Sequence, residues 1–81
     1  MKQTFIIKTS GGGREDFHRV GCKRVETALK YLKGWRLKAI GMGWDKLFTD
    51  LTASDASYKI IATPDGYNLG EVVASGFTAD L

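Results

Sequence analysis

Residues 23–38 form a basic amphipathic segment that constrains the fold more than any other part of the sequence. The segment reads KRVETALKYLKGWRLK, and its apolar residues recur at i, i+3, i+4 and i+7, the spacing of one helical face. Those positions hold Val25, Ala28, Leu29 and Leu32. Gly34 follows the last of these leucines and predicts the end of the helix. One face should therefore enter a core, while the other presents positive charge.

Two β-hairpins are predicted, one before this helix in the chain and one after it. Each has a strand rich in β-branched and aromatic residues, followed by a glycine-containing turn. The first has a strand at 4–8, a turn at 9–14 and a short strand at 16–20; the second has a strand at 58–63, the turn Pro64-Asp65-Gly66 and a strand at 67–74.

The segment between the helix and the second hairpin is less regular. Residues 35–39 alternate apolar with basic side chains, which is typical of a half-buried strand. Residues 45–52 have the spacing of a short second helix, although a strand fits them nearly as well. Phe77, in the C-terminal tail, is expected to join the core. The sequence thus predicts one α+β domain over 1–81, an antiparallel sheet of four or five strands with one main helix packed on one face.

Length and cysteine content indicate how large a core the protein can bury and in which cellular compartment it works. A chain of 81 residues buries only a small core. Its single cysteine, Cys22, forms no intramolecular disulfide, which favours a reducing compartment. Since no apolar run is long enough for a membrane span, we expect a cytoplasmic protein without membrane contacts. We also expect it to be a monomer.

Charge is distributed unevenly along the chain. Residues 1–38 contain ten Lys and Arg against three acids, a charge of +7, whereas residues 39–81 carry −4. An anionic partner is therefore expected for the first half. Aromatic rings among the cations could stack on bases, or simply pack. The predicted partner-binding residues are Arg14, Arg19, Lys23, Lys30, Lys33, Arg36, Lys38 and Tyr31.

Residues for catalysis or for binding a cofactor do not form any recognised pattern. His18 and Cys22 are the only imidazole and thiol, and these two groups alone do not complete a metal site or a nucleophile with its base. The glycine run at 11–13 leads into Glu15 and Asp16, two acids where a bound phosphate would lie. We therefore expect no metal, no cofactor and no enzymatic activity.

The order of these elements resembles that of some small phage-encoded anti-CRISPR proteins. The resemblance rests on the opening Met-Lys with Phe5-Ile6-Ile7-Lys8, the basic helix, and the late hairpin through Ala62-Thr63-Pro64-Asp65-Gly66. It implies a curved antiparallel sheet with a helix. It also implies that the protein binds a CRISPR RNA-guided complex and thereby blocks access of the target DNA to that complex.

The expected function is that of a small non-enzymatic inhibitor. In this hypothesis the basic surface sterically blocks a protein or ribonucleoprotein complex that handles nucleic acid, and charge speeds the encounter. The alternative is a free-standing DNA- or RNA-binding module that contacts the phosphate backbone. A third hypothesis, an interaction domain whose charge is incidental, is disfavoured by the charge asymmetry.

Overall fold

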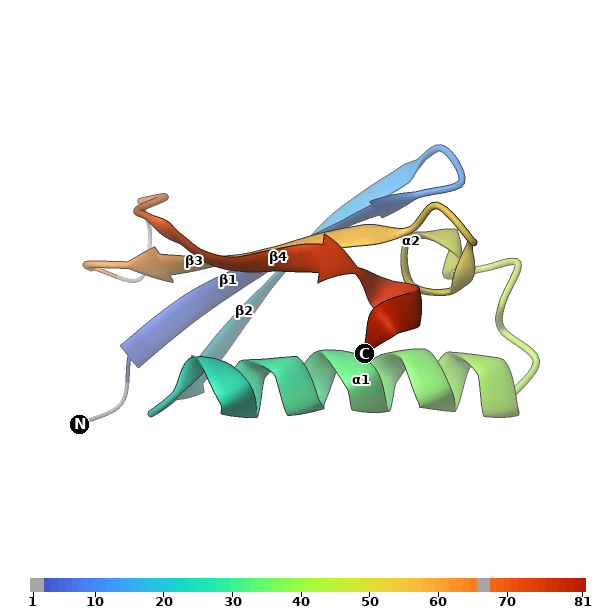
Figure 1. The fold of residues 1–81 in the computed structure, drawn as a ribbon, viewed down its shortest axis with the longest axis horizontal. Helices are drawn as coiled ribbons and strands as arrows, with labels where there is room; N and C mark the ends of the chain where they lie inside the picture. Colours follow the sequence, from blue (N-terminus) through green and yellow to red (C-terminus); the bar gives the residue numbers. More distant parts are fainter. Residues whose placement is uncertain (1–2, 66–67) are drawn as a thin grey trace.

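A computed structural model describes residues 3–65 and 68–81 of the chain. It shows an α+β layout in which one long helix lies beneath an antiparallel sheet (Figure 1). In chain order the elements are β1 (Gln3–Gly11), β2 (Arg14–Cys22), α1 (Val25–Gly41), α2 (Thr49–Thr52), β3 (Ser57–Thr63), β4 (Val72–Phe77) and the 3₁₀ helix η1 (Thr78–Asp80). The predicted fold class is thereby confirmed, with a sheet of four strands.

The sheet has the strand order β2-β1-β3-β4, and every neighbouring pair is antiparallel. β1 and β2 form the first predicted hairpin, and both strands are longer than expected. Their turn requires positive φ at Gly12 (59°) and Gly13 (81°), a conformation that glycine adopts without steric cost. In the second hairpin the returning strand begins at Val72. Gly66 of the predicted turn and Tyr67, where the predicted strand begins, lie outside the described residues.

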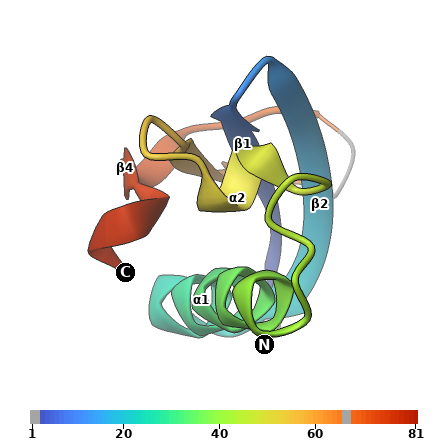
Figure 2. The same ribbon diagram turned by 90° about the vertical axis from the view of Figure 1, so that its right-hand side faces the viewer.

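The core lies between one face of the sheet and α1 (Figure 2). Alternation along β1 turns Phe5 and Ile7 towards the helix, and Ile60 of β3 joins them. Ala28 and Leu32 face them from α1, and both are fully buried. The predicted apolar stripe of the helix is therefore the stripe that packs on the sheet.

The predicted end of the helix at Gly34 is wrong, and so is the predicted strand at 35–39. α1 continues to Gly41, because Trp35 and Ala39 extend the buried stripe by two further turns. Gly34 in a helix interior costs about 1 kcal/mol relative to Ala, and the packing of Trp35 outweighs that cost. Just after the end of the helix at Gly41, the Trp44 N–H donates a hydrogen bond to the Ala39 carbonyl at 2.8 Å and so satisfies one of the last carbonyls of α1.

The second helix forms over only the last part of the predicted segment. α2 is a single turn that buries Asp50 and Leu51.

The expectation that Phe77 joins the core is wrong, since its side chain is 55% exposed. Phe77 pairs with Ser57 and thereby lies on the sheet face away from α1. The buried residue of the tail is Thr78, whose hydroxyl donates to the Leu51 carbonyl at 2.9 Å.

Candidate binding surfaces and a candidate metal centre

The outward face of α1 carries part of the predicted basic surface. Lys30 and Lys33 are exposed, and helical spacing places Leu37 and Ile40 on the same side. These two apolar side chains are 54% and 46% exposed. The face therefore combines two lysines with two uncovered aliphatic groups.

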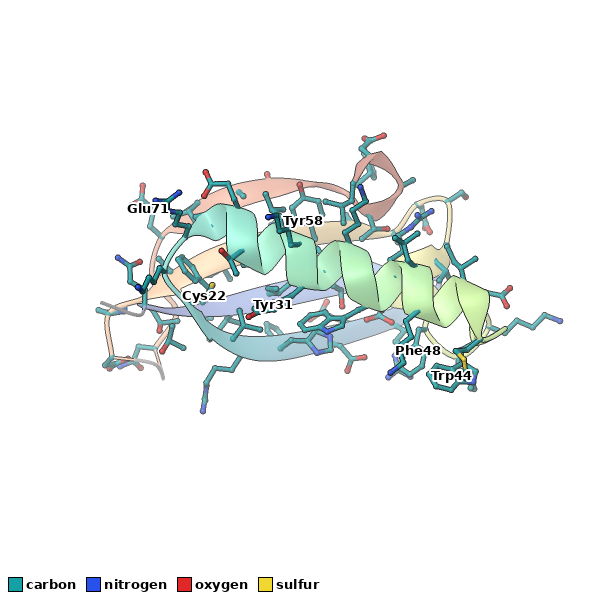
Figure 3. The ribbon with its side chains drawn as sticks, turned by 90° about the horizontal axis from the view of Figure 1, so that it is seen from below. Cys22, Tyr31, Trp44, Phe48, Tyr58 and Glu71 are labelled. Atoms are coloured by element: carbon teal, nitrogen blue, oxygen red, sulfur yellow. The ribbon has the colours of Figure 1, made fainter. Side chains whose placement is uncertain are left out.

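The other predicted helix residues lie around the same cylinder. Lys23 is exposed just before α1, and Lys38 and Tyr31 are exposed on the flank opposite Lys33 (Tyr31 is labelled in Figure 3). Arg36 is half-buried, and its Nε has no hydrogen-bond partner among the described residues. The helical cations thus surround α1 rather than forming one dense patch.

The two predicted arginines of the first hairpin point in opposite directions. Arg14 Nε lies 2.8 Å from Asp16 Oδ2 and 3.2 Å from Asp50 Oδ1, so this cation already has anionic neighbours. Arg19 pairs with Ile6 on the sheet face away from α1, where it also makes an interaction. Neither arginine extends the basic surface of the helix.

The open face of the sheet is a second candidate surface, and sequence reasoning missed it. Lys8 of β1 and Lys59 of β3 lie directly opposite each other on that face. Phe17 pairs with Lys8 from β2 and is 55% exposed, and the Lys8 ammonium lies 5.8 Å from its ring centroid. Phe77, equally exposed, lies on the far strand β4. Two lysines therefore lie between two exposed phenyl rings.

A shallow pocket of about 180 Å³ lies between these lysines. Ser10 and Ser57, which are opposite each other in the register, contribute to its lining. Like charges directly opposite on neighbouring strands destabilise a sheet. The Lys8 ammonium has an ion pair with Glu15 at 3.8 Å, whereas none of the ion pairs among the described residues involves Lys59. This pocket offers ammonium and hydroxyl donors to an anion.

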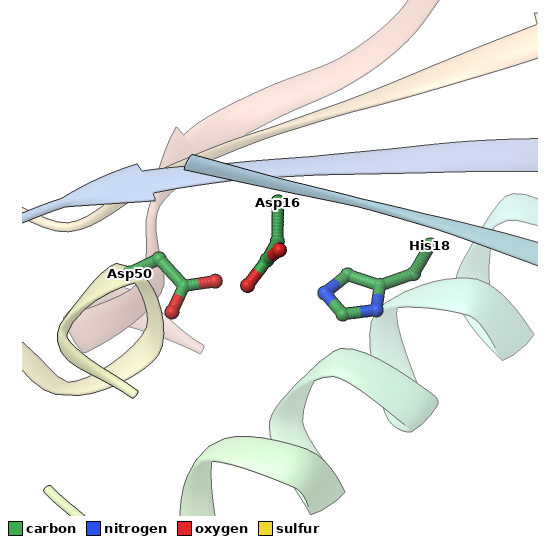
Figure 4. A group of neighbouring side chains, drawn as sticks. All are labelled: Asp16, His18 and Asp50. Carbon is green, nitrogen blue, oxygen red and sulfur yellow. The ribbon is translucent and has the colours of Figure 1, made fainter. Parts of the chain in front are cut away.

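A cluster of polar side chains lies on the covered face of the sheet, near α2. Ligand atoms of Asp16, His18 and Asp50 all lie within 4.8 Å of one another. The imidazole points towards the two carboxylates (Figure 4). Asp50 is fully buried, and its Oδ2 accepts a hydrogen bond from the Thr9 hydroxyl at 2.5 Å.

A cavity of about 260 Å³ adjoins this cluster. Three aromatic side chains form much of its wall, namely Trp35, Trp44 and Phe48. The ring centroids of Trp35 and His18 are 4.9 Å apart. Those of Trp44 and Phe48 are 6.1 Å apart, and Figure 3 labels these two residues beyond the end of the sheet. His18 and Asp50 belong both to the cluster and to this wall.

The sequence reveals only two of the three residues of this cluster as neighbours. Asp16 and His18 are two apart, so a strand places both on one face. Asp50 follows Asp16 by 34 positions, and no local pattern connects them. Only the packing of α2 against the first hairpin brings the second carboxylate to the first, aided by the Thr49 hydroxyl, which donates to the Gly11 carbonyl at 3.1 Å.

Comparisons with protein-family models, with curated proteins and with solved structures found no match to this chain. Within the described residues, no helix has the length and apolar character needed to cross a membrane. Any functional conclusion therefore depends on the surfaces and the buried cluster themselves.

Proposed function

We propose that this protein is a non-enzymatic protein that binds single-stranded nucleic acid on the open face of its sheet. The observation that carries the proposal is the facing pair Lys8 and Lys59 between two exposed phenyl rings. In this mode the ammonium groups contact phosphates, and bases stack on Phe17 and Phe77.

The dimensions of the sheet suit such a strand. Phe17 is on β2 and Phe77 on β4, three strand spacings or about 14 Å apart across the sheet, and the register offsets Phe77 by two residues along the strands. A few nucleotides cross that distance, which is at the low end of the roughly 4–16 nucleotides that an OB fold binds. The lysine pair lies between the rings, where the backbone of the bound strand would pass.

The chemistry of the face predicts binding with little sequence preference. Its contacts to the nucleic acid are ammonium groups and phenyl rings, which interact with phosphates and with the faces of all four bases. Each phosphate contact releases counterions, so the affinity should fall with salt by a log–log slope of about 0.7 per contact.

Fluorescence anisotropy with labelled single-stranded DNA and RNA tests this function. Titrations at about 50 and 200 mM salt should show weaker binding at the higher salt, and K8A/K59A should lower the affinity at least tenfold. F17A and F77A should each cost about 1–3 kcal/mol of binding free energy. The matched control is K46A, an exposed lysine in the connection before α2. Equal affinities of K8A/K59A and K46A would exclude the sheet as the binding surface.

A second candidate function uses the outward face of α1. Here the protein docks on a nucleic-acid-handling complex and inhibits it sterically, as the resemblance to phage anti-CRISPR proteins implies. The exposed Leu37 and Ile40 beside Lys30 and Lys33 favour this role, because contact with a protein surface would bury the aliphatic groups. Both candidate functions assume a monomeric protein in the cytoplasm.

The inhibitor function has its own test. A pull-down and a DNA-cleavage assay with a purified RNA-guided effector should show binding and reduced cleavage. K30E/K33E and L37E should each abolish both effects, while K8A/K59A retains them. If cleavage is unchanged by the wild-type protein, inhibition of that effector is ruled out.

A further inference from the structure

We propose that Asp16, His18 and Asp50 bind a divalent transition-metal ion, with Zn²⁺ the closest chemical match. One imidazole nitrogen and two carboxylate oxygens are ligand types that Zn²⁺ accepts. Their ligand atoms already lie within 4.8 Å of one another (Figure 4). This site is independent of the sheet surface described above.

Two buried atoms of the cluster are left without hydrogen-bond partners. His18 Nε2 and Asp50 Oδ1 are both inaccessible to solvent and unsatisfied within the described part of the chain. Arg14 Nε lies 3.2 Å from Asp50 Oδ1 but directs its hydrogen bond to Asp16. Buried polar atoms in proteins are nearly always satisfied. A metal ion between the three side chains would supply the missing partner to both atoms.

The charge of the cluster also favours a cation. Two carboxylates, one of them fully buried, face the single guanidinium of Arg14. A buried carboxylate needs a nearby positive charge to offset its loss of hydration. A divalent ion would balance both carboxylates without the arginine.

Arg14 occupies the place that the metal ion would take, so the two cations compete. The Arg14 side chain is 46% exposed and lies at the start of β2, directly after the glycine turn. It can therefore turn into solvent when the ion enters. Replacing Arg14 by a neutral residue should strengthen metal binding, a result that a purely structural salt bridge does not predict.

The geometry needs only side-chain adjustment. Zn²⁺ ligands at about 2.0–2.2 Å in a tetrahedron lie roughly 3.3–3.6 Å apart, so a separation at the 4.8 Å limit must shrink by about 1.2–1.5 Å. Asp16 and His18 come from one face of β2, and Thr9 holds Asp50 in position. The fourth coordination position would face the aromatic cavity, which has room for water or a small anionic ligand.

Isothermal titration calorimetry with ZnCl₂ tests the site, and Co²⁺ absorption reports its coordination geometry. The wild-type protein should bind one ion, and D16N and H18A should each weaken binding at least tenfold. R14Q should tighten binding at least threefold. Two matched controls, D55N at an exposed acid and C22A at the only thiol, should leave the affinity unchanged.

Circular dichroism of each variant checks that the fold is retained, and the proposal does not depend on a variant of the buried Asp50. Stoichiometric binding that is lost in H18A and strengthened in R14Q supports the site. Failure of both the wild type and R14Q to bind Zn²⁺ or Co²⁺ overturns it. Binding that disappears in C22A but persists in H18A overturns it as well, because the ion would then be held by the thiol.

Discussion

The two faces of the four-stranded sheet are built from the same strands but differ in what they carry. On the face covered by α1, β1 and β2 contribute Thr9 and His18, which join buried polar and aromatic contacts. On the open face the same strands contribute Lys8 and Phe17, which contact each other, and Lys8 also lies opposite Lys59 and pairs with Glu15. The helix covers the face that carries Phe5 and Ile7, and those side chains become core.

Because of this difference, the covered face contributes mainly to stability and the open face is available for binding. Groups on the covered face are held by partners within the protein, as Asp50 is by Thr9. On the open face, Lys59 and Phe77 gain little from the fold and remain available to an external partner. Substitutions on the covered face should therefore change stability, and those on the open face should change binding.

The largest expected effect is that of L32A on the covered face. Leu32 is fully buried between α1 and the sheet, so its truncation leaves a cavity and should cost about 2–5 kcal/mol of unfolding free energy. Urea denaturation measures it. F77A, at an apolar side chain of the open face, should change stability by less than about 0.5 kcal/mol. Similar losses in the two variants would contradict the difference between the faces.

A smaller loss is expected for D50A. The substitution removes the acceptor of the Thr9 hydroxyl and leaves that buried donor unsatisfied, which should cost about 2 kcal/mol. Thermal unfolding at fixed pH, without added metal, gives the value. D55A, at an exposed acid, serves as the control and should be nearly neutral. A D50A protein as stable as D55A would mean that the polar cluster contributes nothing to the covered face.

G34A tests the length of the helix that covers the sheet. Apart from its chain neighbours and the backbone of its own helix, no atom of the described residues lies within 4 Å of the added methyl group, and the residue is inside α1, so the variant should be about 1 kcal/mol more stable. Destabilisation would indicate that the helix ends at Gly34. G12A is the matched control, and it should be destabilised because φ is +59° and the new Cβ would lie 2.5 Å from the Thr49 Cβ.

The smallest expected change in stability is that of K59E on the open face. Replacing one of two facing lysines by an acid converts repulsion into attraction, worth about 0.5 kcal/mol of added stability at low salt. The same variant should lose nucleic-acid binding in the anisotropy assay. A stability gain that persists at 1 M salt would show that charge is not its cause, since salt screens exposed pairs.

Much of the fold was predictable because its signals are local. Spacing and turn residues predict both hairpins, the apolar stripe of the helix and the short second helix, and the structure confirms these elements with altered bounds, apart from the turn of the second hairpin, which lies partly outside the described residues. The end of the helix was predicted wrongly. A glycine favours termination locally, but burial of Trp35 and Ala39 against the sheet outweighs that preference. The burial of Phe77 was predicted wrongly because its face depends on the pairing of β4.

The candidate sites divide in the same way. The helical cations Lys30 and Lys33 were found from the sequence, because their exposure follows from the apolar stripe on the other side. The facing pair Lys8 and Lys59 was not found, since it depends on the register between β1 and β3. Residues that are far apart in the chain meet only when strands pair, and charge counts along the sequence do not reveal which pairs form.

By itself the sequence determined that the chain has two hairpins and one main helix, and which side of α1 is apolar, since those features follow from side-chain periodicity. Tertiary structure alone decided where α1 ends, which face of each strand it covers, and that Asp16, His18 and Asp50 lie together. The physical reason is that these outcomes depend on burial and pairing between distant residues. The energies of such contacts outweigh local preferences of about 1 kcal/mol per residue.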